Sequence, residues 1–177
     1  METSDYEVHI IVIEALFGRD GLPFLEALGI GEIGKYEAET WTGQRSYSCL
    51  RIPIDDLWTL VVIPSYRIPE LIWSDLRNKW IGVITLCDST DHAQLREVKS
   101  RSETIAAYVP EPQVFAVTHT NEPTSITPED LKILLRLDDF DPVMPVIPCD
   151  LTDTVSVRAV LLRICEMALT AIRTDGL

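Results

Sequence analysis

The residues with the clearest potential for chemistry lie in a turn that follows the first apolar segment of the chain. Gly18, Arg19, Asp20 and Gly21 stand between this segment and an apolar stretch that begins at Leu22. Glycines in such a turn let backbone N–H groups curl around a phosphate at a helix N-terminus, and a lysine and a hydroxyl normally complete the site. Here no lysine, serine or threonine follows the glycines. The turn is therefore a candidate phosphate-binding turn that lacks the charged and metal-binding side chains of such a site.

Arg19 and Asp20 have opposite consequences for an anionic ligand. Arg19 can contact a phosphate in place of the lysine, although most loop arginines are simply solvated. The Asp20 carboxylate, at a helix N-terminus, can cap the N–H groups that a phosphate would otherwise use. We expect the site to be filled by its own aspartate. Loss of the lysine and the metal ligand is expected to weaken phosphate binding by about 10² to 10⁴ fold.

The other candidate groups form no recognisable catalytic or metal site. Asp138, Asp139 and Asp141 lack the spacing and the glycine of a calcium loop, which favours a solvated turn. His119 has no serine or cysteine nucleophile with an orienting third residue beside it, which indicates a surface or loop histidine. The cysteines form no CxxC or Cys/His cluster and are interpreted as buried thiols in a reducing compartment. They are Cys49, Cys87, Cys149 and Cys165.

The composition is that of a folded chain with a strong negative charge. Of the 177 residues, 46% are hydrophobic and 24% charged, and the formal net charge is −13. This charge disfavours nucleic acid and anionic membrane surfaces as partners, although it also fits a role in solubility alone. The N-terminus does not resemble a signal peptide, and no apolar run has the length of a membrane span. We expect a single cytoplasmic domain over residues 1–177.

Apolar β-branched runs alternate with amphipathic segments, which is typical of an α/β fold with helices on both faces of a mainly parallel sheet. We expect strands at 7–14, 47–54, 57–63, 80–87, 113–118 and 143–147. We expect helices at 22–28, 69–76, 92–108, 127–137 and 154–172. Residues 29–43, which include four glycines, are expected to form a loop. The prediction is a six-stranded, mostly parallel sheet with one antiparallel edge strand and about five helices.

Three of these elements carry specific signals. The strands at 47–54 and 57–63 are expected to form a hairpin through Asp55 and Asp56. Thr127 suits the N-cap of the fourth helix, with Pro128 at its first position and acidic residues in its first turn. The last helix carries apolar residues on one side and should pack on the sheet. They are Val157, Val160, Leu161, Ile164, Met167, Ala168 and Ala171.

Six strands, five helices and an antiparallel hairpin as strands two and three describe the small GTPase domain. The residues at 17–18 (FG) and 24–28 (FLEAL) resemble the phosphate-loop region of bacterial Ras-like GTPases related to the gliding protein MglA and the signal recognition particle receptor beta subunit. Pro64 and Trp73 match the spacing of their second switch. Segments similar to their fourth strand, their guanine-reading loop and their fifth guanine-site element lie at 83–89, 114–123 and 146–149. The resemblance covers nearly the whole chain and implies the P-loop NTPase-like fold of small GTPases.

The same resemblance shows which catalytic groups are missing. Asp20 stands where the family has the second glycine of its phosphate loop, Gly21 where it has the lysine, and Leu22 where it has the magnesium-binding hydroxyl. The second-switch stretch around Ser65 has neither the glycine that meets the γ-phosphate nor the glutamine that orients the attacking water. We therefore expect no GTP hydrolysis.

Guanine recognition is altered as well. Thr118, His119, Thr120 and Asn121 occupy the four places of the family's NKxD motif. An asparagine side chain offers one acceptor and one donor face, so Asn121 cannot accept the two hydrogen bonds that the family's aspartate accepts. Cys149 and the residues after it depart from the family's Ser-Ala pattern. The vestigial nucleotide-binding positions are Gly18, Arg19, Asp20, Gly21, Leu22, Thr118, His119, Asn121 and Cys149.

These observations favour a pseudo-GTPase without a cofactor, acting as a protein-binding scaffold or regulatory module. The resemblance implies a roadblock- or longin-type dimer as partner, because bacterial relatives are regulated by such dimers. The alternative is an atypical small GTPase that binds GTP or GDP with magnesium, using Arg19 and backbone groups in place of the lysine.

Overall fold

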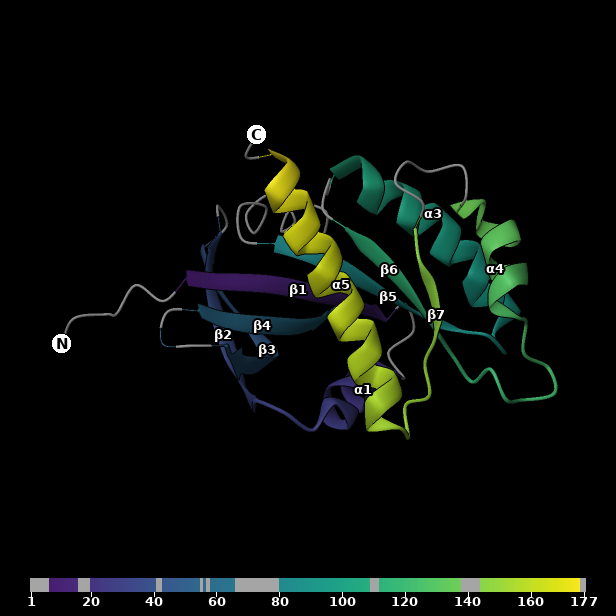
Figure 1. The fold of residues 1–177 in the computed structure, drawn as a ribbon, viewed down its shortest axis with the longest axis horizontal. Helices are drawn as coiled ribbons and strands as arrows, with labels where there is room; N and C mark the ends of the chain where they lie inside the picture. The colour runs from purple at the N-terminus through teal and green to yellow at the C-terminus, as the bar shows by residue number, and fades with distance from the viewer. Residues whose placement is uncertain are drawn as a thin grey trace.

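The computed structural model describes residues 7–15, 20–40, 43–54, 56, 58–65, 80–108, 112–137 and 144–175. The strands are β1 (Glu7–Ala15), β2 (Glu32–Thr40), β3 (Gly43–Pro53), β4 (Trp58–Ser65), β5 (Trp80–Asp88), β6 (Gln113–Thr118) and β7 (Val146–Pro148). The helices are α1 (Gly21–Leu28), α3 (His92–Tyr108), α4 (Pro128–Leu135) and α5 (Thr154–Asp175). Figure 1 shows these elements in the order of the chain.

The strands form one mixed sheet in the order β2-β3-β4-β1-β5-β6-β7. The five strands from β4 to β7 in this order are parallel, whereas β3 is antiparallel to both β4 and β2. The α/β class and the hairpin of β3 and β4 are confirmed. The predicted strand number was wrong, because the described residues form seven strands, and the antiparallel strand β3 does not lie at the sheet edge.

The extra strand is β2, in the segment predicted as a loop. Only Tyr36 and Ala38 of its residues are among the buried hydrophobic side chains, and the strand also carries lysine, glycine and glutamates, so it has no apolar run. Its extended form comes from pairing with β3 along its whole length, from Glu32 opposite Arg51 to Thr40 opposite Gly43. A tertiary ladder of this kind overrides weak local propensity.

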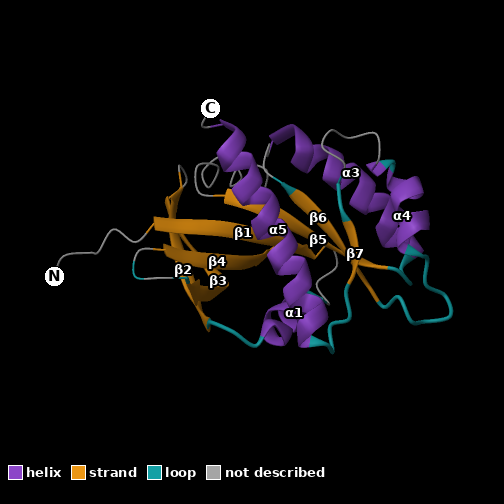
Figure 2. Ribbon diagram, in the orientation of Figure 1, coloured by secondary structure: helices purple, strands orange, loops and turns teal. Residues whose placement is uncertain are grey.

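Helices cover both faces of the sheet (Figure 2). On one face, α1 and α5 pack over alternate strand residues such as Ile84 and Val114. On the other face, α3 and α4 pack over residues such as Phe115 and Val117. A Cβ on Gly82 of β5 would lie 2.5 Å from the Cγ1 of Ile164, so the glycine lets α5 approach the sheet closely.

The specific local signals hold in the helices. The Thr127 hydroxyl accepts a hydrogen bond from the Asp130 N–H at 3.1 Å, which confirms the predicted N-cap of α4. Five of the seven predicted core residues of α5 are buried, and Met167 packs against the same cluster. The predicted helix at 69–76 lies outside the described residues, so four helices are described rather than five. No helix among the described residues is long and apolar enough to span a membrane.

Candidate functional site

The candidate site lies where β1, β5, β6 and β7 end and their connections to the following helices begin. Carboxyl ends of parallel strands share one edge of a sheet, and ligands of open α/β proteins bind at this edge. Backbone hydrogen bonds continue past the strand ends: the Ser89 N–H donates to the Thr118 carbonyl at 3.2 Å and the Cys149 N–H donates to the Val117 carbonyl at 2.8 Å. The segments that contain Asp20, Thr118 and Cys149 therefore meet at this edge.

Asp20 connects the start of α1 to the end of β6. Its Oδ2 accepts a hydrogen bond from the Thr118 hydroxyl at 2.7 Å, across 98 positions of sequence. The Thr118 Oγ also lies 3.3 Å from the Cys87 carbonyl oxygen, but a hydroxyl has one hydrogen, and the shorter contact to a carboxylate is the stronger one. Thr118 is fully buried, and the Asp20 side chain is only 12% exposed. The carboxylate is thus held inside the site by a charged hydrogen bond.

The predicted capping role of Asp20 is wrong. Asp20 is the N-cap residue of α1, yet its side chain makes no capping hydrogen bond. Its backbone has φ −97° and ψ −16°, in the helical region, whereas a capping residue normally has extended backbone that aims its side chain at the free N–H groups. The side chain instead meets the hydroxyl that β6 presents.

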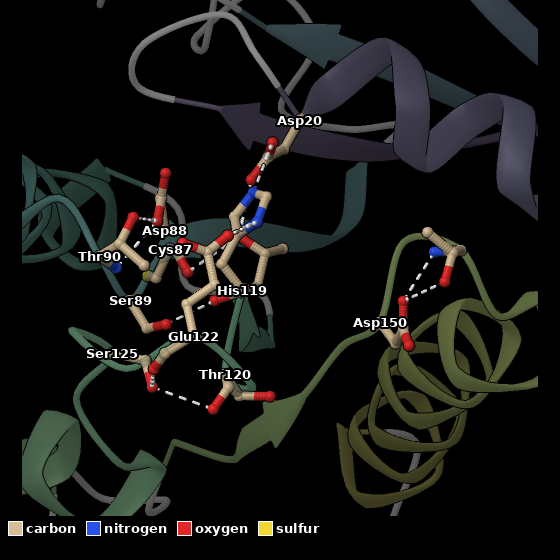
Figure 3. Close-up of polar contacts among 12 residues, drawn as sticks. Asp20, Cys87, Asp88, Ser89, Thr90, His119, Thr120, Glu122, Ser125 and Asp150 are labelled. Carbon is tan, nitrogen blue, oxygen red and sulfur yellow. Dashed lines mark hydrogen bonds and ion pairs between the residues drawn. The ribbon is translucent and has the colours of Figure 1, made fainter.

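His119 follows Thr118 and lies between two carboxylates (Figure 3). Its Nε2 is 3.6 Å from the Asp20 Oδ1, and its Nδ1 is 3.4 Å from the Glu122 Oε1. These distances are long for hydrogen bonds, so the contacts are ionic when the imidazole is protonated. His119 has φ +57°, in the left-handed region that few non-glycine residues adopt. This backbone turn swings the imidazole towards Asp20 and Glu122.

The loop after His119 is tied to the end of β5. The Ser89 hydroxyl donates to the Thr118 carbonyl at 2.7 Å, and the Ile126 N–H donates to the Ser89 carbonyl at 3.1 Å. Within the loop, the Ser125 hydroxyl lies within hydrogen-bond distance of two carbonyl oxygens, at 3.0 Å from that of Thr120 and 2.7 Å from that of Glu122. The loop that would read the base is therefore held by its own polar groups.

The other predicted positions that the structure describes do not join this cluster of Asp20, Thr118, His119 and Glu122. Gly21 is buried at the start of α1, while Leu22 and Asn121 are exposed. Gly18 and Arg19 lie outside the described residues, as does the acidic segment at 138–141. Within the described ranges, no group of three or more His, Cys, Asp or Glu side chains is placed to hold a metal ion.

Cys149 is buried directly after β7. Burial, followed by the negative charges of Asp150 and Asp20, raises the pKa of its thiol to about 12. A thiol that stays protonated at neutral pH is a poor nucleophile. The sequence interpretation of the cysteines as buried thiols is confirmed for Cys49, Cys87 and Cys149, whereas Cys165 is only partly buried.

Sequence reasoning missed two residues of the network. Glu122 lies three residues after His119, a spacing that pairs opposite charges in a helix, but here a turn brings the two together. Ser89 carries no local signal for its role, because its partner Thr118 lies 29 positions away and is brought near only by the pairing of β5 with β6.

The two hydroxyls beside His119 are paired with other groups of the chain. The hydroxyls of Thr118 and Ser89 donate to Asp20 and to a backbone carbonyl, so neither is paired with the His119 imidazole as a nucleophile would be. The cluster also carries two carboxylates, Asp20 and Glu122, at the edge where an anionic nucleotide would bind.

Comparison of the sequence with protein-family models and with curated proteins gives no match. Among solved structures, the chain is similar to the Arl6 (BBS3) small GTPase from Trypanosoma brucei with bound nucleotide analogue GppNp. The TM-score is 0.63 at 16% sequence identity, over 92% of this chain and 98% of that chain. At this identity the similarity establishes the fold alone, and this chain therefore has the α/β fold of a small Ras-like GTPase.

Proposed function

We propose that this chain is a pseudo-GTPase, which keeps the fold as a protein-binding module and does not hydrolyse GTP. The observation that carries the proposal is the 2.7 Å hydrogen bond from the Thr118 hydroxyl to the Asp20 carboxylate. It joins the end of the phosphate-loop window to the guanine-reading segment, two places that both face the nucleotide in an active GTPase. The Asp20 carboxylate and the Thr118 hydroxyl thus satisfy each other without a ligand.

Electrostatics supports the proposal. A phosphate charge 4 Å from a carboxylate is repelled by about 1 kcal/mol in bulk water and about 4 kcal/mol at the effective dielectric constant near a protein surface. The Asp20 side chain is 12% exposed, so water screens it only in part. The missing lysine removes a further 1.5 to 3 kcal/mol, roughly, of charged hydrogen bonding. At the dielectric constant near a protein surface, the Asp20 repulsion alone exceeds what the N-terminus of α1 can supply to a phosphate through the helix dipole, about 0.3 to 1 kcal/mol.

The direct test is nucleotide binding by the purified chain. The protein is expected to retain no GDP or GTP on purification and to bind magnesium-GTP with a Kd weaker than about 100 μM in titration calorimetry, as the lost contacts imply. Micromolar, magnesium-dependent binding would contradict the proposal and favour the alternative, an atypical small GTPase that binds through Arg19 and backbone groups.

Asp20→Gly sharpens this test, because it restores a glycine at the position of the blocking carboxylate. Asp153→Gly is the matched control, since it removes a carboxylate that also directly precedes a helix, where its Oδ1 accepts from the Val155 N–H at 2.9 Å. If GDP raises the melting temperature of Asp20→Gly alone, the Asp20 side chain is what closes the pocket. If GDP stabilises neither variant, the loss of the lysine and the hydroxyl is sufficient.

The protein partner follows from the resemblance to bacterial Ras-like GTPases, which are regulated by roadblock- or longin-type dimers. We propose a partner of that class for this chain. Affinity capture from the native host with mass spectrometry should recover such a dimer, and the purified dimer should then bind the purified chain in the absence of nucleotide. Binding that requires added GTP would contradict the pseudo-GTPase assignment.

A further inference from the structure

The outer side of α5 carries a row of exposed aliphatic side chains. Val155 is 75% exposed, Leu162 63% and Leu169 56%. The three residues are spaced seven apart along the helix. Single exposed apolar residues need no explanation, but a regular row along four turns of a helix gives one apolar position of the seven-residue repeat with which helices pack on one another.

The spacing keeps the row on one side of α5. Seven residues are nearly two turns of an α-helix, so each successive aliphatic residue is displaced by only about 20° around the helix axis. The side that packs on the sheet, which includes Val157 and Ile164, is the opposite one. In Figure 1, α5 runs across the front of the sheet with its outer side towards the viewer. We call Val155, Leu162 and Leu169 the α5 row.

The charges of α5 differ from those of the rest of the chain. The helix contains three arginines against one glutamate and one aspartate, for a local charge of about +1 from its side chains. The chain as a whole carries −13. Two copies of such an acidic chain repel each other over most of their surfaces, whereas α5 itself is not acidic.

The order of residues on this side is self-complementary. In an antiparallel pair of α5 helices, a twofold axis passes beside Leu162. A residue that lies a given number of positions before Leu162 in one copy then faces the residue that lies the same number of positions after Leu162 in the other copy. Val155 then meets Leu169, and Arg158 meets Glu166. Arg158 is already held in place, because its Nε donates to the Leu28 carbonyl at 2.9 Å. A twofold axis forms every such contact twice, which is the usual arrangement of a symmetric dimer.

We propose that a second copy of this chain binds the α5 row, with the two α5 helices antiparallel about Leu162. The Leu162 side chains meet at the axis, the aliphatic ends of the row pack against each other, and Arg158 pairs with Glu166 of the other copy. Glu166 already lies 3.4 Å from Arg163 of its own chain, so in the dimer it is flanked by two guanidinium groups. This interface does not depend on the state of the nucleotide site.

The test compares two exposed aliphatic residues on different helices. Leu162→Arg places two positive charges at the axis, whereas Ile133→Arg makes the same change on α4, where Ile133 is 73% exposed. Sedimentation equilibrium over a concentration series is expected to show dimerisation of the wild type. We expect the dimer Kd of Leu162→Arg to rise by at least about tenfold and that of Ile133→Arg to stay unchanged. Circular dichroism melts check that both variants fold.

A second measurement locates the axis. In a Cys165→Ser background, Leu162→Cys is expected to form an intermolecular disulfide on mild oxidation, and Ile133→Cys in the same background is expected to form none, although it still dimerises without a covalent link. A wild type that stays monomeric over the whole series overturns the proposal. It is equally overturned if Leu162→Arg dimerises like the wild type, or if the two cysteine variants cross-link to the same extent.

Discussion

Two aspartates at the same edge of the sheet differ in what they bind. Asp20 precedes α1, and its carboxylate accepts a hydrogen bond from Thr118, 98 positions away. Asp150 precedes α5, and its Oδ1 accepts from the N–H and the hydroxyl of Thr152, two positions away, at 2.8 and 2.7 Å. The Asp20 side chain is nearly buried, and Asp150 is exposed. Figure 3 shows the two carboxylates in separate groups of contacts.

The difference shows that an aspartate before a helix can bind a residue distant in the sequence or one in its own turn. The Asp150 turn is a local motif that an Asp-x-Thr sequence forms wherever the chain bends. The Asp20 contact exists only because the sheet brings β1 and β6 to the same edge, and its low exposure strengthens the charged hydrogen bond. Stability should therefore depend on Asp20 and much less on Asp150, and each of the following experiments tests part of that contrast.

The largest effect is expected from Asp20→Ala. The substitution removes the acceptor of a nearly buried charged hydrogen bond, and a bond of this kind contributes about 1.5 to 3 kcal/mol to the free energy of unfolding. Urea denaturation at pH 7 measures the loss. Asp20→Asn is the control, because its amide oxygen can still accept from the Thr118 hydroxyl, and it should recover part of the stability. Equal losses in the two variants would show that the carboxylate itself, not this bond, sets the effect.

A somewhat smaller effect is expected from Thr118→Val. Valine keeps the shape of threonine but has no hydroxyl, so the Asp20 carboxylate loses its donor at a cost of about 1 to 2 kcal/mol. In the double variant with Asp20→Ala, the total loss of unfolding free energy should be smaller than the sum of the two single losses, because both substitutions remove the same hydrogen bond. Strict additivity in denaturant unfolding would mean that the two side chains do not interact.

A smaller effect again is expected from alkaline pH at Cys149, whose thiol is close enough to feel both aspartates. Its folded pKa of about 12 lies above the ordinary value of 9.0, so the folded state favours the neutral thiol. Its contribution is complete below pH 9 and is lost as the pH rises from 9 towards 12. The linkage relation gives a loss of about 1 kcal/mol between pH 9 and pH 10. In urea denaturation, the free energy of unfolding should fall more steeply between pH 9 and pH 10 for the wild type than for Cys149→Ala. An equal pH dependence of the two proteins would exclude the effect.

The smallest effect is expected from Asp150→Ala. The Thr152 hydroxyl, and then the Thr152 N–H, lower the pKa of the Asp150 carboxyl, so its contribution is present above the unfolded pKa and lost as the pH falls through the folded value. Because the group is exposed, water and salt screen that contribution. The melting temperature at pH 7 should drop less than in Asp20→Ala, and the difference from wild type should vanish in acid. A drop at pH 7 as large as that of Asp20→Ala would remove the contrast between the two sites.

Much of the fold was predictable from local patterns. The β-branched runs of β1, β5 and β6 and the cap of α4 identify their elements, because burial in a parallel sheet and satisfaction of helix-end N–H groups leave a direct trace in residue type. The edge strand β2 left no such trace, since few of its side chains are buried. Its conformation depends on the neighbouring β3, and also on Gly31, which has φ +79° and no room for a Cβ beside the Arg51 carbonyl.

The candidate site, like the fold, was predictable from the sequence only in part. The sequence alone identified the turn that contains Asp20 and the segment from Thr118 to Asn121, and it showed that the side chains of a working phosphate loop are missing there. It also suggested that Asp20 would act on its own helix, because capping is the local option for an aspartate before a helix. Only the tertiary structure decided otherwise. Pairing of β1 with β5 and of β5 with β6 brings a buried hydroxyl to within 2.7 Å of the carboxylate, and no pattern within either segment records that distance.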